Sequence, residues 1–132
     1  MGARINRCLG MGLALLVGVA CGDSTGPGIQ PQITNVTDNF QYQVTAVQGY
    51  SGVLTYHWQN TGTTATVNQA TTVTAGTMTL VVKDAAGTEV YNQSLATNGT
   101  LDTAAGTAGL WTIVVTYANA SGTVNFRVQK KP

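Results

Sequence analysis

GLWTIVVTYANASGTVNFRV, residues 109–128, carries the clearest structural pattern in the chain. Apolar side chains recur at every second position in its first half (Trp111, Ile113, Val115 and Tyr117) and again in its second half (Val124, Phe126 and Val128). A period of two is the repeat of a β-strand that has one face in a core and the other in water. The residues ANASG, 118–122, favour a turn, so the stretch predicts two strands joined by a short hairpin.

The same alternation extends toward the N-terminus. Three stretches predict further strands, FQYQVTAV, VLTYHWQN and TMTLVVK, whose inward faces hold Phe40, Tyr42, Val44 and Ala46, then Leu54, Tyr56 and Trp58, then Met78, Leu80 and Val82. Weaker strand patterns cover Ile33 to Val36, Ala65 to Gln69 and Glu89 to Leu95. DAAG at 84–87 predicts a hairpin turn, and the aperiodic, glycine-rich stretch from Ala96 to Gly109 predicts a long loop.

These patterns predict an all-β domain over residues 32–130. Seven or eight strands without a helical period between them suit two packed antiparallel sheets better than one sheet with an exposed apolar face. We therefore expect a β-sandwich, with a jelly-roll or an immunoglobulin-like strand order left open. Seven aromatic residues fall on the inward faces, where large rings supply core packing: Phe40, Tyr42, Tyr56, Trp58, Trp111, Tyr117 and Phe126. Tyr50 falls in a predicted loop, and the facing of Tyr91 is left open.

The first 20 residues have the pattern of a secretory signal peptide. Arg4 and Arg7 precede thirteen uncharged residues that end at Ala20, and a basic start followed by a short apolar run is typical of such leaders. Thirteen helical residues span roughly 20 Å, less than the hydrocarbon core of about 30 Å that a transmembrane helix must cross. The spacing therefore favours a leader over a permanent membrane span.

Cys21 stands directly after this leader. The sequence Gly18-Val19-Ala20-Cys21 resembles the lipobox of bacterial lipoproteins, although that family usually has leucine where Gly18 stands. The resemblance implies that Cys21 is lipidated, becomes the mature N-terminus and anchors the protein to the periplasmic or outer-surface face of a bacterial membrane. The small and polar residues that follow predict a flexible tether over residues 21–31.

The composition argues against several classes of site. Cys8 lies in the leader, so a processed chain has no internal disulfide, and there is no paired-cysteine or Cys/His cluster for zinc or redox chemistry. We expect no metal and no cofactor. After the leader, four basic residues face five acidic ones, a balance that gives no electrostatic reason to expect nucleic acid.

The sequence also lacks a recognisable catalytic group. His57 is the only histidine, and alternation places it on the outer face of its strand, opposite Tyr56 and Trp58. A general base needs a nucleophile or an acid within reach, and the sequence holds no G-x-S-x-G motif. The acidic residues are dispersed along the chain, so we expect that the protein is not an enzyme.

A second resemblance covers residues 77–128. The hairpin TLVVKDAAGTEVY, the long Gly/Thr loop and the stretch GLWTIVVTYANASGTVNFRV are similar to the C-terminal half of small extracytoplasmic jelly-roll or immunoglobulin-like domains. These include the pre-peptidase C-terminal type attached to secreted bacterial enzymes. Such domains are usually noncatalytic accessories, so the resemblance implies an accessory role. We expect that this chain departs from the pattern in having no enzyme attached.

Together these features predict a lipid-anchored, extracytoplasmic binding or accessory module that has a protein partner in the cell envelope. We expect the binding surface on the loops at one end of the sandwich, 96–109 and 49–52, with the candidate residues Tyr50, His57, Tyr91 and Asp102. One alternative is an accessory subunit that caps the extracytoplasmic side of a larger membrane complex. Another is a carbohydrate-binding module, which would need exposed aromatic rings.

Overall fold

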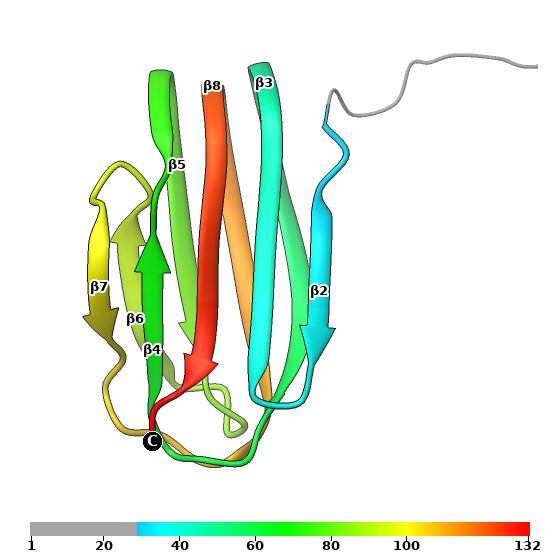
Figure 1. The fold of residues 1–132 in the computed structure, drawn as a ribbon. Coiled ribbons are helices and arrows are strands. Elements are labelled where there is room, and N and C mark those ends of the chain that lie inside the picture. Colours follow the sequence, from blue (N-terminus) through cyan, green and yellow to red (C-terminus); the bar gives the residue numbers. More distant parts are fainter. Residues whose placement is uncertain (1–28) are drawn as a thin grey trace, which may run out of the picture.

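A computed structural model describes residues 29–132 as an all-β domain (Figure 1). Its seven strands form one antiparallel sheet in the order β2-β3-β8-β4-β7, and β5 pairs with both β8 and β6. The strands are β2 (Gln32–Val36), β3 (Asn39–Asn60), β4 (Ala65–Gln69), β5 (Thr72–Lys83), β6 (Glu89–Ser94), β7 (Gly99–Asp102) and β8 (Gly109–Lys130). The leader and Cys21 lie outside the described residues.

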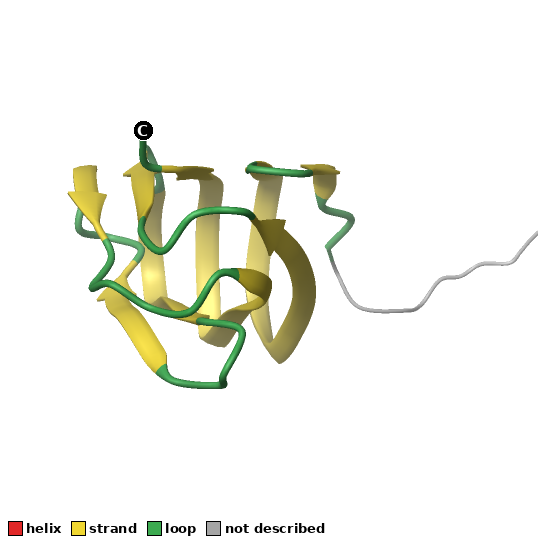
Figure 2. Cartoon of the chain, turned by 90° about the horizontal axis from the view of Figure 1, so that it is seen from below, coloured by secondary structure: helices red, strands yellow, loops and turns green. Residues whose placement is uncertain are grey.

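The single sheet bends over to make the two layers of a sandwich (Figures 1 and 2). The front layer, in the orientation of Figure 1, contains β2, β4, β7, residues 39–44 of β3, the first two residues of β5 (72 and 73) and residues 123–130 of β8. The rear layer contains β6, residues 52–60 of β3, 77–83 of β5 and 109–117 of β8. The predicted antiparallel sandwich is confirmed, but its layers are parts of one continuous sheet because three strands run through both.

Each of these three strands turns a corner between the layers. The corners coincide with shifts in pairing register and with positive φ angles, at Ala46 and Gly49 in β3, Gly76 in β5, and Asn119 and Gly122 in β8. ANASG is therefore a corner inside one strand, and the prediction of a hairpin there is wrong. The prediction of a loop at 49–52 is wrong for the same reason.

The β3 corner also reverses the facing of two residues. Alternation from Phe40 predicts Ala46 inside and Val47 outside, but Ala46 is exposed and Val47 is buried. Ala46 has a φ of 59° next to a register shift, and an irregularity of this kind offsets the alternation by one position. All other inward residues predicted on the main strands are buried or packed against the core.

The core lies between the layers and is rich in aromatic rings. Phe40 in the front layer packs on Tyr56 in the rear layer with ring centroids 5.7 Å apart. Trp58 and Trp111 meet edge to face at 5.9 Å within the rear layer. Ile29, which the sequence places in the tether, is buried and belongs to the same core cluster.

The lower end of the sandwich is covered by the connections at residues 61–64, 84–88 and 103–108 (Figure 2). The Gly106 amide donates to the Thr63 carbonyl, and the Ala85 amide donates to the Thr107 carbonyl. Asp84 is buried among them, and its carboxylate accepts hydrogen bonds from the amides of Ala86, Thr88 and Thr107 at 2.8–3.0 Å. These bonds, the one from Thr88 above all, lower the pKa of Asp84. The hairpin predicted at DAAG is confirmed, with Asp84 organising its backbone.

A pair of buried tyrosines should make the fold sensitive to alkali. The hydroxyls of Tyr42 and Tyr117 are 2.7 Å apart between the layers, and burial raises the pKa of Tyr117 to about 12 and that of Tyr42 as well. An unfolded tyrosine has a pKa of about 10, so the folded state holds these protons more tightly. Their contribution to stability is complete below pH 10 and is lost as pH rises toward 12, at about 1.4 kcal/mol per pH unit for each tyrosine.

Urea unfolding at a series of pH values between 9 and 12 measures this effect. The Tyr117→Phe variant should show a shallower decline than the unaltered protein, because one of the titrating groups is gone. A free energy of unfolding that stays constant through this range would contradict the burial of these hydroxyls.

Candidate functional site

The structure keeps the four predicted site residues apart. Tyr50 lies in the β3 corner, half-buried, with its ring edge-on to Tyr117 at a centroid distance of 5.1 Å. Asp102 lies on β7 at the edge of the front layer, and His57 lies on the rear part of β3. No loop brings these side chains into one cluster among residues 29–132.

His57 is exposed on the outer face of the rear layer, as the alternation predicts. Its Nδ1 lies 3.5 Å from the Thr112 hydroxyl, which is the one hydrogen-bond neighbour of the imidazole ring in the part of the chain that the structure describes. No group of three or more His, Cys, Asp or Glu side chains occurs among these residues in an arrangement that would hold a metal. The surroundings of His57 therefore offer neither a catalytic partner nor further metal ligands.

Tyr91 faces the interior. It is 6% exposed, and its hydroxyl donates a hydrogen bond to Oε1 of the buried Gln69. The register shift opposite Lys83 places Val90 and Tyr91 on the inner side in succession. Burial raises the pKa of Tyr91 to about 12. A ring in this position supports the core and does not offer a stacking surface to a ligand.

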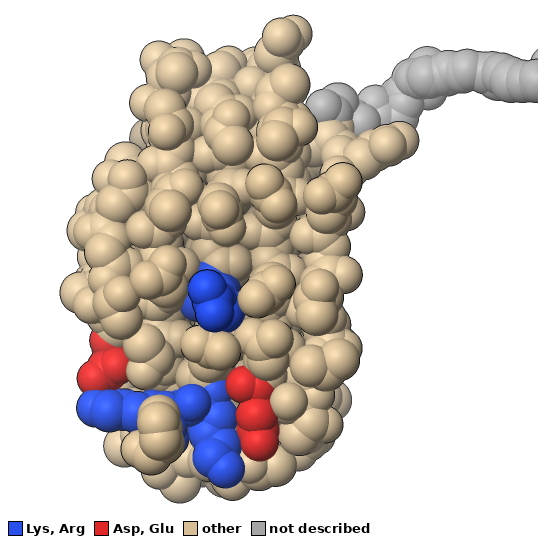
Figure 3. Space-filling view, in the orientation of Figure 1, with Lys and Arg blue, Asp and Glu red and all other residues tan. Residues whose placement is uncertain are grey.

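The carboxylate of Asp102, at the lower end of the front layer, interacts with two neighbouring side chains. It accepts from the Thr66 hydroxyl at 3.0 Å and forms an ion pair with Lys131 at 2.7 Å. The hydrogen bond from Lys131 is the main reason that its pKa is lowered. Lys130 is similarly paired with Asp38 at 3.8 Å. The charges at this end, which appear together in Figure 3, thus largely compensate one another.

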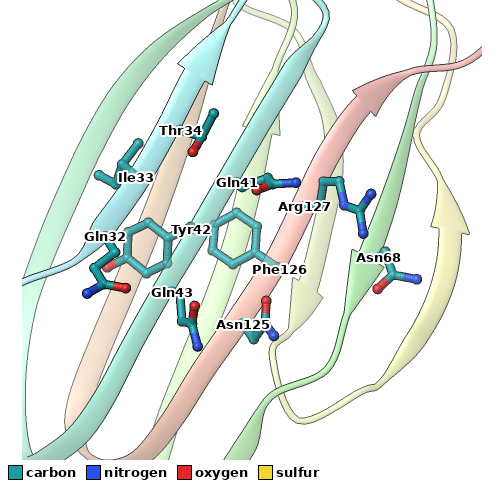
Figure 4. A pocket seen from close by; sticks show the side chains of 10 residues that line it. All are labelled: Gln32, Ile33, Thr34, Gln41, Tyr42, Gln43, Asn68, Asn125, Phe126 and Arg127. Atoms are coloured by element: carbon teal, nitrogen blue, oxygen red, sulfur yellow. The ribbon is translucent and has the colours of Figure 1, made fainter.

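A polar hollow lies on the outer face of the front layer, where the sequence analysis expected no site. It has a volume of about 360 Å³, within the range of small ligand sites. We call it the front hollow. Its lining comes from β2, β3, β4 and β8 and consists of Gln32, Ile33, Thr34, Gln41, Tyr42, Gln43, Asn68, Asn125, Phe126 and Arg127 (Figure 4).

Strand alternation determines the chemistry of the front hollow. Tyr42 and Phe126 turn their rings into the core, where they stack at 4.9 Å, so the residues on either side of them must point outward. Register then aligns the outward side chains across the strands: Gln41 is opposite Arg127, and Gln43 is opposite Asn125. The result is a surface of amide groups on a rigid sheet.

Arg127 lies between two of the amide side chains. Gln41 on β3 is its register partner on one side, and Asn68 on β4 is its register partner on the other (Figure 4). Arg127 is exposed and has neither an ion pair nor a side-chain hydrogen bond within the described residues. In Figure 3 one basic side chain lies alone in the middle of this face, above the paired charges at the lower end. Its charge is available to a ligand.

One part of this site could have been found from the sequence. The outward positions of two predicted strands read Gln41, Gln43, Asn125 and Arg127, a visible enrichment in amide side chains. The pairing of β4 with the end of β8, which brings Asn68 beside Arg127, joins segments 59 residues apart and has no local signal. The complete site could not be predicted because the sequence does not show which distant strands pair.

Comparisons with protein-family models and with curated proteins found no match for this chain. Among residues 29–132, no helix has the length and apolar character needed to cross a membrane.

Proposed function

We propose that the protein is a lipid-anchored, extracytoplasmic and non-catalytic binding module, and that the front hollow is its binding surface. The observation that carries this proposal is the convergence of amide side chains and an unpaired arginine on one rigid sheet face. These groups donate and accept hydrogen bonds, but none of them is a nucleophile or a general acid or base at neutral pH. Such a surface recognises a ligand without transforming it.

The positions of the ionisable groups support the non-catalytic part of the proposal. His57 lies on the rear layer, Asp84 is held by backbone amides, and Asp102 is paired with Lys131. A hydrolytic site needs two such groups directed at one bond, about 5 to 10 Å apart in glycosidases. Groups that are committed to different neighbours on different parts of the domain do not meet this requirement.

The lipid anchor is proposed from the lipobox resemblance at Cys21. Acyl chains gain roughly 0.8 kcal/mol per buried methylene group, so the several chains implied for Cys21 would hold a domain of this size at a membrane. The tether would let the front hollow meet ligands near the membrane at a raised effective concentration.

An accessory role in a membrane complex is the second candidate, and a feature of the rear layer favours it. The outer face of that layer is lined by Thr and Val side chains, among them Thr55, Val81, Thr112, Val114 and Thr116. Val53 and Leu110 on this layer are 61% and 55% exposed. A stoichiometric protein partner that contacts this face would favour the accessory role.

Labelling with a palmitate analogue tests the anchor directly. The full-length protein is produced in a bacterial host supplied with an alkyne-bearing palmitate, and covalent label is read on a denaturing gel. Cys21→Ser should lose the label completely, because the acylated thiol is gone. Cys8→Ser is the matched control and should keep it, because that cysteine lies within the leader. Label that persists in Cys21→Ser would contradict the proposed anchor.

A further inference from the structure

We infer that the front hollow binds an acidic oligosaccharide, with a sugar carboxylate on Arg127 and ring hydroxyls on the surrounding amides. This inference rests on the proposed binding function and specifies its ligand class. It is carried by two features of the site, an uncompensated cation and a surrounding set of amide side chains.

The positive charge of Arg127 indicates an anionic ligand. Arg127 is the cation that lines the hollow, and the acidic residues at the lower end of the domain, Asp38 and Asp102, are paired with lysines. A guanidinium group is planar and donates two parallel hydrogen bonds to a carboxylate. One arginine matches the single charge of a carboxylate, whereas a doubly charged phosphate is better matched by a cluster of cations.

The neighbours of Arg127 suit hydroxyl groups. Gln41 and Asn68 flank it across the sheet, and Gln43 and Asn125 extend the amide surface along β3 and β8. A primary amide offers two donors and an acceptor, and a sugar hydroxyl can pair with either. An amide surface that also holds a carboxylate binder therefore matches a uronic acid joined to further sugar rings.

Other features of the hollow separate a sugar from a peptide. Peptides that bind to sheets take affinity from a free strand edge and specificity from pockets for alternate side chains. The front hollow instead opens on the face of paired strands, and Ile33 is its one exposed apolar residue, at 38%. Tyr42 and Phe126 keep their rings in the core, so sugar recognition here works through hydrogen bonds and charge without ring stacking.

Binding of a small panel of oligosaccharides to the full-length protein in mild detergent tests the inference. The panel contains tetramers of galacturonate, mannuronate and hyaluronate, each with its methyl-esterified form, and isothermal titration calorimetry gives the Kd. At least one acidic tetramer should bind, and its ester should bind at least about tenfold more weakly, because hydrogen bonds to charged groups are the stronger ones. Added salt should weaken binding of the acidic form.

Two variants assign the effect to the site. Arg127→Gln should weaken binding of the acidic tetramer at least about tenfold and leave the weak binding of the ester unchanged. Lys83→Gln is the matched control, because it removes one exposed cation from the rear layer, away from the hollow. It should bind as the unaltered protein does. Arg127 is exposed and makes no ion pair among the described residues, so its replacement should not disturb folding, which circular dichroism checks.

Failure to bind any acidic tetramer, equal binding of acid and ester, or equal effects of Arg127→Gln and Lys83→Gln would each overturn the inference. Failure of the proposed function gives different results. Loss of the anchor would appear in the palmitate labelling and would leave oligosaccharide binding intact. A lipidated protein that binds no acidic sugar but copurifies with a stoichiometric protein would favour the accessory role and overturn this ligand assignment.

Discussion

Replacing Trp111 with alanine should cost about 3–5 kcal/mol of the free energy of unfolding. Trp111 is fully buried on the inner face of the rear layer, and its ring meets that of Trp58 at 5.9 Å and 87°. Its indole N–H also donates to the Thr107 carbonyl at 2.8 Å, which fixes the segment that leads into β8. The substitution removes this bond and opens a large cavity. Domains of this size have a total stability of about 5–15 kcal/mol, so the loss is a large share of it.

Urea unfolding followed by circular dichroism measures this loss, since the substitution also changes tryptophan fluorescence. Trp111→Phe serves as a milder companion, because it keeps part of the ring packing and should remain folded if the alanine variant does not. Leu110→Ala is the matched control on the same strand: its side chain is 55% exposed, and the cost should stay within about 0.5 kcal/mol. Similar costs at the two positions would contradict the assigned facing of β8.

The second large effect is expected at the corner of β8. Gly122 has a φ of 141°, and a Cβ atom there would lie 2.0 Å from the carbonyl oxygen of Thr72. Backbone cannot move aside as a flexible side chain can, so Gly122→Ala combines conformational strain with a clash between β8 and β5. We expect a loss of at least about 3 kcal/mol, measured by urea unfolding.

Gly49→Ala provides a control at a neighbouring corner. Gly49 also has a positive φ, 58°, but no heavy atom lies within 4 Å of a Cβ built there. Its substitution should cost about 1–2 kcal/mol, the penalty for a left-handed backbone alone. If Gly122→Ala were as mild as Gly49→Ala, the close contact between the corners of β5 and β8 would be wrong.

Local patterns predicted most of the strands, because alternation of buried and exposed residues needs no knowledge of distant contacts. The strand at Ala65 to Gln69 has the predicted bounds, and Trp111, Ile113, Val115 and Tyr117 are all buried. The sequence predicts turns at these corners because glycine and asparagine with positive φ occur both in hairpin turns and at corners within a strand. Whether a chain pairs with itself after such a residue, or crosses to the opposite layer, depends on partners elsewhere in the sequence.

The short strand β7 shows a different limit. Gly99–Asp102 lies inside the stretch that predicts a long loop, because four residues are too few to display a period. Its pairing with β4 supplies the missing stabilisation: Val67 is opposite Leu101, and Asn68 donates a hydrogen bond to the Thr100 hydroxyl. Tertiary pairing, which no local composition signals, decides the structure of this segment.

The front hollow shows the same difference between local patterns, which the sequence reveals, and long-range pairing, which it does not. Outward-facing Gln41 and Arg127 could be read from alternation on each strand, but their meeting depends on the long-range pairing of β3 with β8. Loops and exposed aromatic residues are where a sequence predicts a binding site, but Tyr91 is buried. A site built from amides on a sheet face has no motif, so only the register could bring it into view.

The central claim is that this domain is displayed on a membrane by lipid at Cys21 as a binding module. The intact mass of the unaltered protein, purified in mild detergent from the membranes of its own host, tests that claim most directly. The account predicts a mass that corresponds to residues 21–132 plus acyl chains. An unacylated mass that retains residues 1–20 would contradict it and would make the apolar stretch 8–20 a membrane segment.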